Sequence, residues 1–181
     1  MSDIKESCEI CMDCEVLLEL SLSNMKNNVR RYFGQEREQR SNRVNVVNYD
    51  IIPFIPEKSL LIKSRMRGEH GNYTPQIRFS NVQFSNEQQP GFVAAKGVDG
   101  SDFFVRQFTA AQTQAKVRCN CLDFYYRFSV WNKAKNSLEG DPPKPYIKKT
   151  DSAPQNPNHV AGSCKHIMKL ATFLRSEGIL R

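Results

Sequence analysis

The sequence predicts an α+β fold, in which helices and antiparallel strands occupy separate stretches of the chain. Apolar residues recur at helical spacing over residues 8–40 and again near the C-terminus, whereas strand-forming residues fill the middle of the chain. Glycine-containing turns between the strands predict hairpins, and therefore antiparallel pairing. We expect a helical arm over 1–43, an antiparallel β region over 44–114 and a strand–helix–loop–helix unit over 115–181.

The composition fits a packed globular protein and favours some classes of function over others. A hydrophobic content of 39% over 181 residues is enough for one core with an added arm. The sequence contains no run of about 18 apolar residues, so no membrane span is predicted, and the first residues lack the apolar core of a signal peptide. We therefore expect an intracellular, reducing compartment or a virion. With three histidines, no phosphate-binding glycine loop and no nucleophile elbow, we expect neither an enzyme nor a small-molecule substrate.

The charge is unevenly distributed along the chain. Residues 1–23 hold six acidic side chains and one lysine, a net charge of −5, which leaves +12 for the rest of the chain. This acidic segment, which is the first part of the predicted helical arm, either docks on another subunit, folds back on the chain's own basic surface or presents a solvated helix face. We predict docking on another subunit, because the arm also has an apolar side formed by Leu17, Leu18, Leu20 and Leu22.

Strand-forming residues, interrupted by turns, extend from 44 to 108. Two pairs of predicted strands flank glycine-containing turns at 68–72 and 97–101, so each pair reads as a hairpin. The alternation of apolar residues slips by one position after Phe79, which predicts a β-bulge near Asn81. The strands are expected at 44–55, 60–67, 73–84, 92–96 and 102–108.

The last third of the chain begins with a short extended segment at 117–121. Aromatic and apolar residues then recur at helical spacing, namely Phe124, Phe128, Trp131 and Leu138. This spacing predicts the buried face of a helix. The alternative is that the aromatic rings stack on nucleic-acid bases. Five prolines make 139–160 a long loop without a helix. Ser163 is positioned to cap a final helix that ends at Gly178. Its buried face is predicted to consist of Ile167, Leu170, Ala171 and Leu174.

Four residues of this region have the spacing of a metal site. Cys119 and Cys121 lie two positions apart in an extended segment, so their side chains point to the same side. Cys164 lies at a predicted helix start, where the helix dipole favours a thiolate, and His166 follows in the first turn. Three thiolates and one imidazole complete a tetrahedral structural zinc site. His159 is a less favoured alternative to His166, and three small buried cysteines with a surface histidine are the non-metal interpretation.

The pattern C-x-C…C-x-H formed by these residues resembles a SWIM-type zinc finger. The order of elements is also similar, with C-x-C on a strand and C-x-H at the start of a helix. The resemblance covers residues 115–178 and implies structural zinc and an accessory role in DNA or protein binding. The gap between the two ligand pairs is longer here than in that family. The stretch 148–166, which includes Lys148, Lys149, Asn156, Pro157 and Cys164, also looks similar to small proteins of tailed phages and related viruses.

A second group of cysteines, Cys8, Cys11 and Cys14, allows two interpretations. At a spacing of three, the thiols share one broad face of a helix and either pack as small apolar groups or bind a second metal ion. A second zinc site needs a fourth ligand, for which His70 is the remaining histidine outside the proline loop.

These observations predict a zinc-stabilised structural protein that assembles with other subunits, as in a phage or viral particle or a similar complex. The alternative is a DNA-binding accessory protein that contacts the phosphate backbone without reading the base sequence. The basic residues predicted to contact nucleic acid or a partner near the metal are Lys144, Lys148, Lys149, Lys165, Lys169 and Arg175. Three further basic residues, Arg65, Arg67 and Arg78, are expected to extend this contact surface along the sheet.

Overall fold

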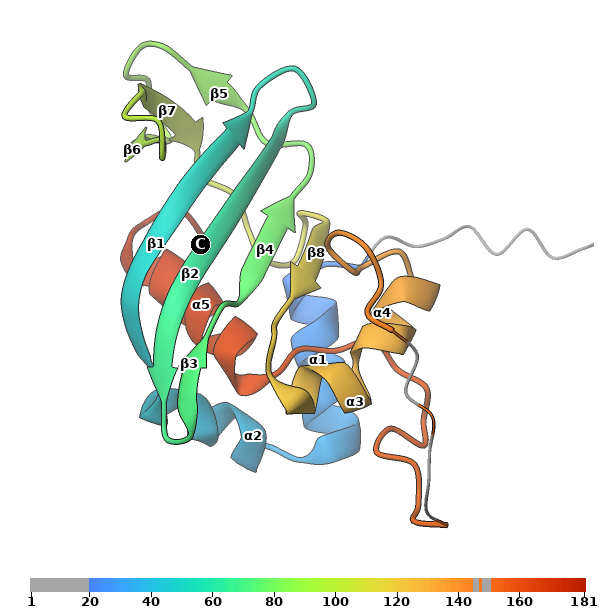
Figure 1. Ribbon diagram of the computed structural model, residues 1–181. Coiled ribbons are helices and arrows are strands. Elements are labelled where there is room, and N and C mark those ends of the chain that lie inside the picture. Colours follow the sequence, from blue (N-terminus) through green and yellow to red (C-terminus); the bar gives the residue numbers. More distant parts are fainter. Residues whose placement is uncertain (1–19, 145–146, 148–150) are drawn as a thin grey trace, which may run out of the picture.

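Two antiparallel sheets and several helices form the α+β architecture that the sequence predicts (Figure 1). The computed structural model describes residues 20–144, 147 and 151–181. The larger sheet has the strand order β1-β2-β4-β8, with β3 also paired to β2, and the smaller sheet has the order β5-β7-β6. The strands are β1 (Asn45–Phe54), β2 (Ser59–Gly68), β3 (Gly71–Tyr73), β4 (Gln76–Phe79), β5 (Phe84–Ser85), β6 (Phe92–Lys96), β7 (Asp102–Arg106) and β8 (Ala115–Arg118). The helices are α1 (Leu22–Phe33), α2 (Glu36–Gln39), η1 (Arg40–Arg43), α3 (Leu122–Arg127), α4 (Ser129–Ala134) and α5 (Lys165–Ser176).

The larger sheet has one face in the core and one open face. Figure 1 shows α5 lying across the sheet on one side, where the Tyr49 ring of β1 packs edge-on against Phe173 of α5. On that side β2 contributes buried Leu60, Ile62 and Met66, which share a single core with apolar residues of α1 and α5. All three regions predicted from the sequence therefore contribute to one hydrophobic core.

The helical arm predicted at the N-terminus is interrupted in the structure. Ser21 caps α1, since its hydroxyl accepts a hydrogen bond from the Asn24 backbone N–H and its own N–H donates to the Asn24 side chain. The helix ends at Gly34, whose φ of 81° lies in the left-handed region that glycine tolerates. Leu20 and Leu22 pack in this chain's own core, so they are not free to dock on another subunit. Leu17 and Leu18 lie outside the described residues.

The strand expected over 73–84 is instead divided between the two sheets. The strand β4 ends at Phe79, and β5 joins the smaller sheet at Phe84. Asn81 between them has a φ of 58°, which turns the chain. The slip in apolar alternation thus marks a change of sheet, and the bulge predicted there is wrong. An irregularity in pairing lies instead in β1, between Val46 and Asn48.

The last third of the chain follows the predicted strand, helix, loop and helix order. Phe124 and Phe128 are buried, but the helix divides at Phe128 into α3 and α4, and Leu138 lies beyond α4 in a bridge with Val117. Trp131 is only partly buried and stacks on His159. The Asn156 side chain holds the proline loop by donating hydrogen bonds to two backbone carbonyls, those of Arg127 and Val160.

The final helix begins one residue later than predicted. Cys164, with extended backbone angles, takes the N-cap position, and it makes no side-chain capping bond. The prediction that Ser163 caps this helix is therefore wrong, because Ser163 precedes the cap residue. Ile167, Leu170 and Leu174 are buried as predicted, and Ala171 is partly buried. Within the described ranges, no helix has both the length and the apolar character needed to cross a bilayer.

Candidate metal centre

Three elements of the fold bring Cys119, Cys121, Cys164 and His166 together. Cys119 follows β8, and Cys121 two residues later is the N-cap of α3. Cys164 is the N-cap of α5, and His166 lies in the first turn of that helix. Two helix starts and one strand end therefore meet at this cluster.

The spacing of the four ligand atoms fits a tetrahedral metal ion. The three sulfur atoms and one imidazole nitrogen all lie within 4.8 Å of one another, and all four residues are buried. His166 Nδ1 lies 3.7 Å from Cys119 Sγ and 3.8 Å from Cys164 Sγ. Tetrahedral bonds of about 2.3 Å to sulfur and about 2.0–2.1 Å to nitrogen place these atoms about 3.6 Å apart. These four residues could thus bind a metal ion with little rearrangement.

The three thiols interact through hydrogen bonds, so the pKa of each depends on the other two. A hydrogen bond with Cys121 raises the pKa of the Cys119 thiol. The same interaction, with a second one from Cys164, lowers the pKa of Cys121, and the Phe124 N–H also donates to the Cys121 sulfur at 3.4 Å. Burial raises the pKa of Cys164. Without a metal ion, Cys121 is thus the favoured thiolate, and a metal ion would displace the protons of the other two thiols.

The β2–β3 hairpin supplies the groups that pack around His166. The Tyr73 ring of β3 stacks on the imidazole, with centroids 3.9 Å apart. A Cβ added to Gly68 would lie 3.0 Å from the Tyr73 ring and 3.5 Å from His166 Nε2. Nε2 is buried and has no hydrogen-bond partner within the described part of the chain. Sequence reasoning missed Tyr73 and Gly68, although Gly68 stands in a predicted hairpin turn.

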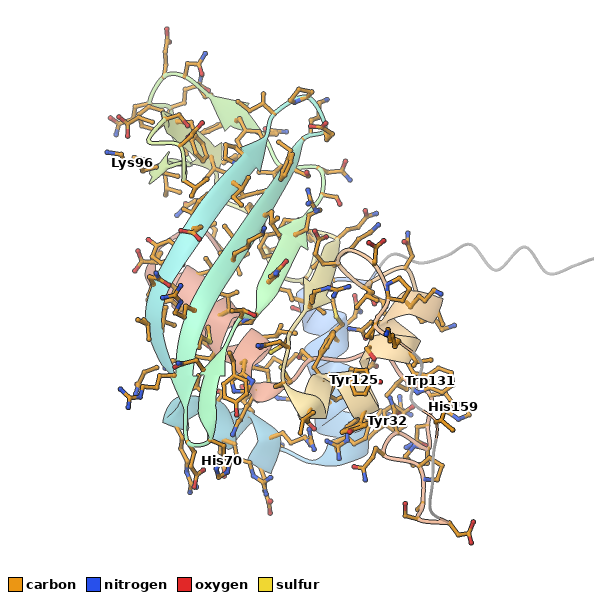
Figure 2. All side chains as sticks on the ribbon, viewed as in Figure 1. Tyr32, His70, Lys96, Tyr125, Trp131 and His159 are labelled. Atoms are coloured by element: carbon orange, nitrogen blue, oxygen red, sulfur yellow. The ribbon has the colours of Figure 1, made fainter. Side chains whose placement is uncertain are left out.

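The other two histidines lie apart from this cluster. His159 has a φ of 54° and stacks on Trp131, with ring centroids 4.1 Å apart; Figure 2 shows the two side chains together beside the proline loop. His70 stands at the exposed tip of the β2–β3 hairpin next to Glu69 (Figure 2). Cys8, Cys11 and Cys14, the candidate second metal site, lie outside the described residues.

The basic residues predicted near the metal lie in different surroundings. Lys165 lines a pocket with Arg37 and Arg40, whereas Arg175 lines another pocket, with Lys26. Lys169 is half-buried on α5, and Lys144 is exposed in the proline loop. Lys148 and Lys149 fall among the residues that the structure does not describe.

The three basic residues expected along the sheet also differ from one another. Arg65 and Arg67 are exposed on β2. Arg78 of β4 forms an ion pair with the buried Glu139 and stacks over Phe54. The charge of Arg78 is thus already compensated within the fold.

Comparisons with protein-family models, curated proteins and solved structures find no match to this chain. What identifies this site is its geometry. Three buried thiols and one buried imidazole converge from one strand end and two helix starts.

Proposed function

We propose that Cys119, Cys121, Cys164 and His166 bind one structural zinc ion in a non-enzymatic protein that assembles with other subunits. The observation that carries this proposal is the buried cluster of three thiols and one imidazole at tetrahedral spacing. Thiolate and imidazole together are the ligand set that zinc prefers. The order of the ligands, C-x-C after a strand and C-x-H at a helix start, supports the resemblance to a SWIM-type finger.

A structural role follows from the number and burial of the ligands. Four protein ligands fill a tetrahedral zinc ion and leave no position for a water molecule or a substrate. The ion would join the end of β8 to the starts of α3 and α5, and would close the loop of 42 residues between Cys121 and Cys164. The free energy of metal binding would then contribute to folding.

An exposed apolar stripe beside the metal centre supports an assembly role. Leu122, Tyr126 and Val130 recur every four residues along α3 and the start of α4, and their exposed fractions are 68%, 45% and 58%. Apolar side chains at helical spacing are typical of a surface that binds another protein. The metal would fix the first turn of α3, next to Leu122, and so position the stripe. On the basis of the resemblance of 148–166 to small phage proteins, noted from the sequence, we propose a viral particle or a similar complex as the setting.

The stripe can be tested independently of the metal. In the double variant Leu122→Ser/Val130→Ser, we expect native mass spectrometry of the complex purified from its source to show loss of the partner subunit, with bound zinc unchanged. The matched control is Val47→Ser/Val98→Ser, which removes two valines of similar exposure elsewhere on the surface. Retention of the partner by the stripe variant, or its equal loss from the control, would refute the assembly role.

A further inference from the structure

The open face of the larger sheet has a row of basic side chains along its second strand. Lys63, Arg65 and Arg67 of β2 are exposed, while the residues between them, Ser64 and Met66, are buried. Side chains two positions apart on a strand point to the same face, so the three side chains leave the strand in a line from Cα atoms about 6.8 Å apart. The row ends at the β2–β3 hairpin.

The strands on either side add polar groups to the same face. In the pairing register, residues directly opposite one another share a face of the sheet. The register partners of the three cations are Asp50, Asn48 and Asn45 on β1, Asn72 on β3 and Gln76 on β4. Among these described partners Asp50 is the one carboxylate, and it forms no ion pair with Lys63 within the described residues.

The three cations differ from most of the buried and half-buried arginines of the fold. Arg37, Arg78 and Arg127 each pair with a carboxylate. Within the part of the chain that the structure describes, Lys63, Arg65 and Arg67 have no ion pair or side-chain hydrogen bond. Their charges therefore remain available to an external anion.

We propose that this basic face, defined by Lys63, Arg65 and Arg67, binds the phosphate backbone of a nucleic acid. Lysine, arginine, asparagine and glutamine are the side chains that contact phosphates, and this face presents all four. A protein partner would instead need apolar or aromatic anchors, and the register partners of the three cations are all polar. The net charge of +12 on residues 24–181 adds a long-range attraction to a polyanion.

This inference concerns a different surface from the zinc site and does not depend on the proposed assembly role. It also places nucleic-acid contact on the sheet rather than on α5 and the proline loop. Backbone contact without base readout would make binding strongly dependent on salt and nearly independent of base sequence.

The test compares two triple substitutions that remove the same charge. The face variant is Lys63→Gln/Arg65→Gln/Arg67→Gln, and the control is Lys96→Gln/Lys133→Gln/Arg31→Gln. The control residues are exposed on β6, α4 and α1 (Figure 2 labels Lys96 on the smaller sheet). Binding to a labelled 30-base-pair DNA duplex of arbitrary sequence is measured by fluorescence anisotropy over a series of salt concentrations.

We expect the face variant to lower the slope of log affinity against log salt by about 3, since each phosphate contact contributes about 0.9. The control should leave the slope unchanged, and each single face substitution should lower it by about 1. Three results would overturn the inference: no binding of the wild-type protein to the duplex at low salt, equal effects of the two triple variants, or binding of polyglutamate in preference to DNA.

Discussion

The phenol ring of Tyr73 stacks on the imidazole of His166, with ring centroids 3.9 Å apart and planes inclined by 26°. The two residues come from β3 and α5, so the contact connects the edge of the sheet to the helix that carries two of the candidate ligands. Stacking restricts tilting of the imidazole plane, and in this plane Nδ1 faces the sulfur atoms of Cys119 and Cys164. The hairpin thus helps to orient a candidate ligand without contributing one itself.

Removal of a single thiol should abolish zinc binding. For Cys121→Ser we expect zinc content to fall from one ion per chain to none, and the free energy of unfolding to fall by about 3 kcal/mol or more. Zinc is counted by native mass spectrometry and elemental analysis of protein prepared without chelator. The control is Cys8→Ser/Cys11→Ser/Cys14→Ser, which should retain one zinc. Wild-type protein that contains no zinc would exclude the site.

Zinc affinity should rise with pH. The pKa of Cys119 and of Cys164 is raised, so both thiols hold protons at neutral pH, whereas the pKa of Cys121 is lowered. Binding must release about two protons, and acidification favours the protonated, metal-free form. Stability contributed by the metal is therefore present at higher pH and lost as pH falls. Chelator competition between about pH 7 and pH 8 should show an affinity increase of about 100-fold; a flat profile would contradict this protonation pattern.

The ring of Tyr73 should support zinc affinity, while its hydroxyl should not. We expect Tyr73→Ala to weaken zinc binding about 10-fold and Tyr73→Phe to leave it unchanged, because the aromatic face is what contacts His166. Tyr32→Ala, an exposed tyrosine on α1, is the matched control. Affinities come from the same chelator competition. Equal affinities for the Ala and Phe variants at position 73 would mean that stacking does not position the ligand.

Gly68→Ala should disturb the same contact, because an added Cβ would lie close to both rings. The added methyl group would lie 3.0 Å from the Tyr73 ring, so the ring must move by a few tenths of an ångström. We expect a loss of about 1 kcal/mol in the free energy of unfolding of the zinc-bound protein, measured by denaturant titration. Combination with Tyr73→Ala should remove most of this cost, and an undiminished cost in the double variant would place the strain elsewhere.

Asn132 should be required to hold the end of the proline loop against α4. Its buried side chain donates to the Gly162 carbonyl at 3.0 Å and accepts from the Gly162 N–H at 2.8 Å. We expect Asn132→Ala to lower the free energy of unfolding by about 2–3 kcal/mol, because two buried backbone groups lose their partners. Asn86→Ala, at an exposed position, is the control. Thermal unfolding with coincident midpoints for the two variants would contradict this role.

Gly162→Ala tests the same contact between the end of the proline loop and α4. An added Cβ would lie 2.6 Å from the Phe128 ring, which is fully buried. Since neither the backbone at 162 nor the core ring can move freely, we expect a loss of about 2–3 kcal/mol. Weakened zinc binding should accompany it, because Gly162 precedes Cys164 by two residues. A melting temperature equal to that of the wild type would show that the loop shifts without cost.

Local sequence patterns were sufficient to predict the elements that carry the candidate ligands. The hairpins around 68–72 and 97–101 and the helix after Cys164 form as predicted, because turn residues and apolar periodicity act over a few neighbours. The segment predicted to be extended over 117–121 is a strand only over Ala115–Arg118, so Cys119 follows the strand and Cys121 begins α3. The four candidate ligands could be chosen for the same reason. Spacing of two positions places Cys119 and Cys121 on one side, and the helix start places Cys164 and His166 together.

Long-range contacts decided what the patterns could not. The slip after Phe79 looks like a bulge locally, but it is a change of sheet, since β5 finds its partner in β7 some 20 residues later. The apolar side of the arm looks like a docking surface, yet Leu20 and Leu22 find their contacts in the core formed by distant strands and α5. Neither outcome can be read from neighbouring residues, because both depend on which surfaces the whole fold leaves uncovered.

The sequence by itself thus determined the fold class, the separation of helical and strand regions and the identity of four candidate ligands. Only the tertiary structure showed that these ligands converge within 4.8 Å, that Tyr73 packs on His166, and that Lys63, Arg65 and Arg67 lie on an uncovered face. The physical reason is the range of the interactions. Helix and strand formation is governed by spacing along the chain, whereas convergence, stacking and exposure depend on how β3, β8 and α5 pack against one another.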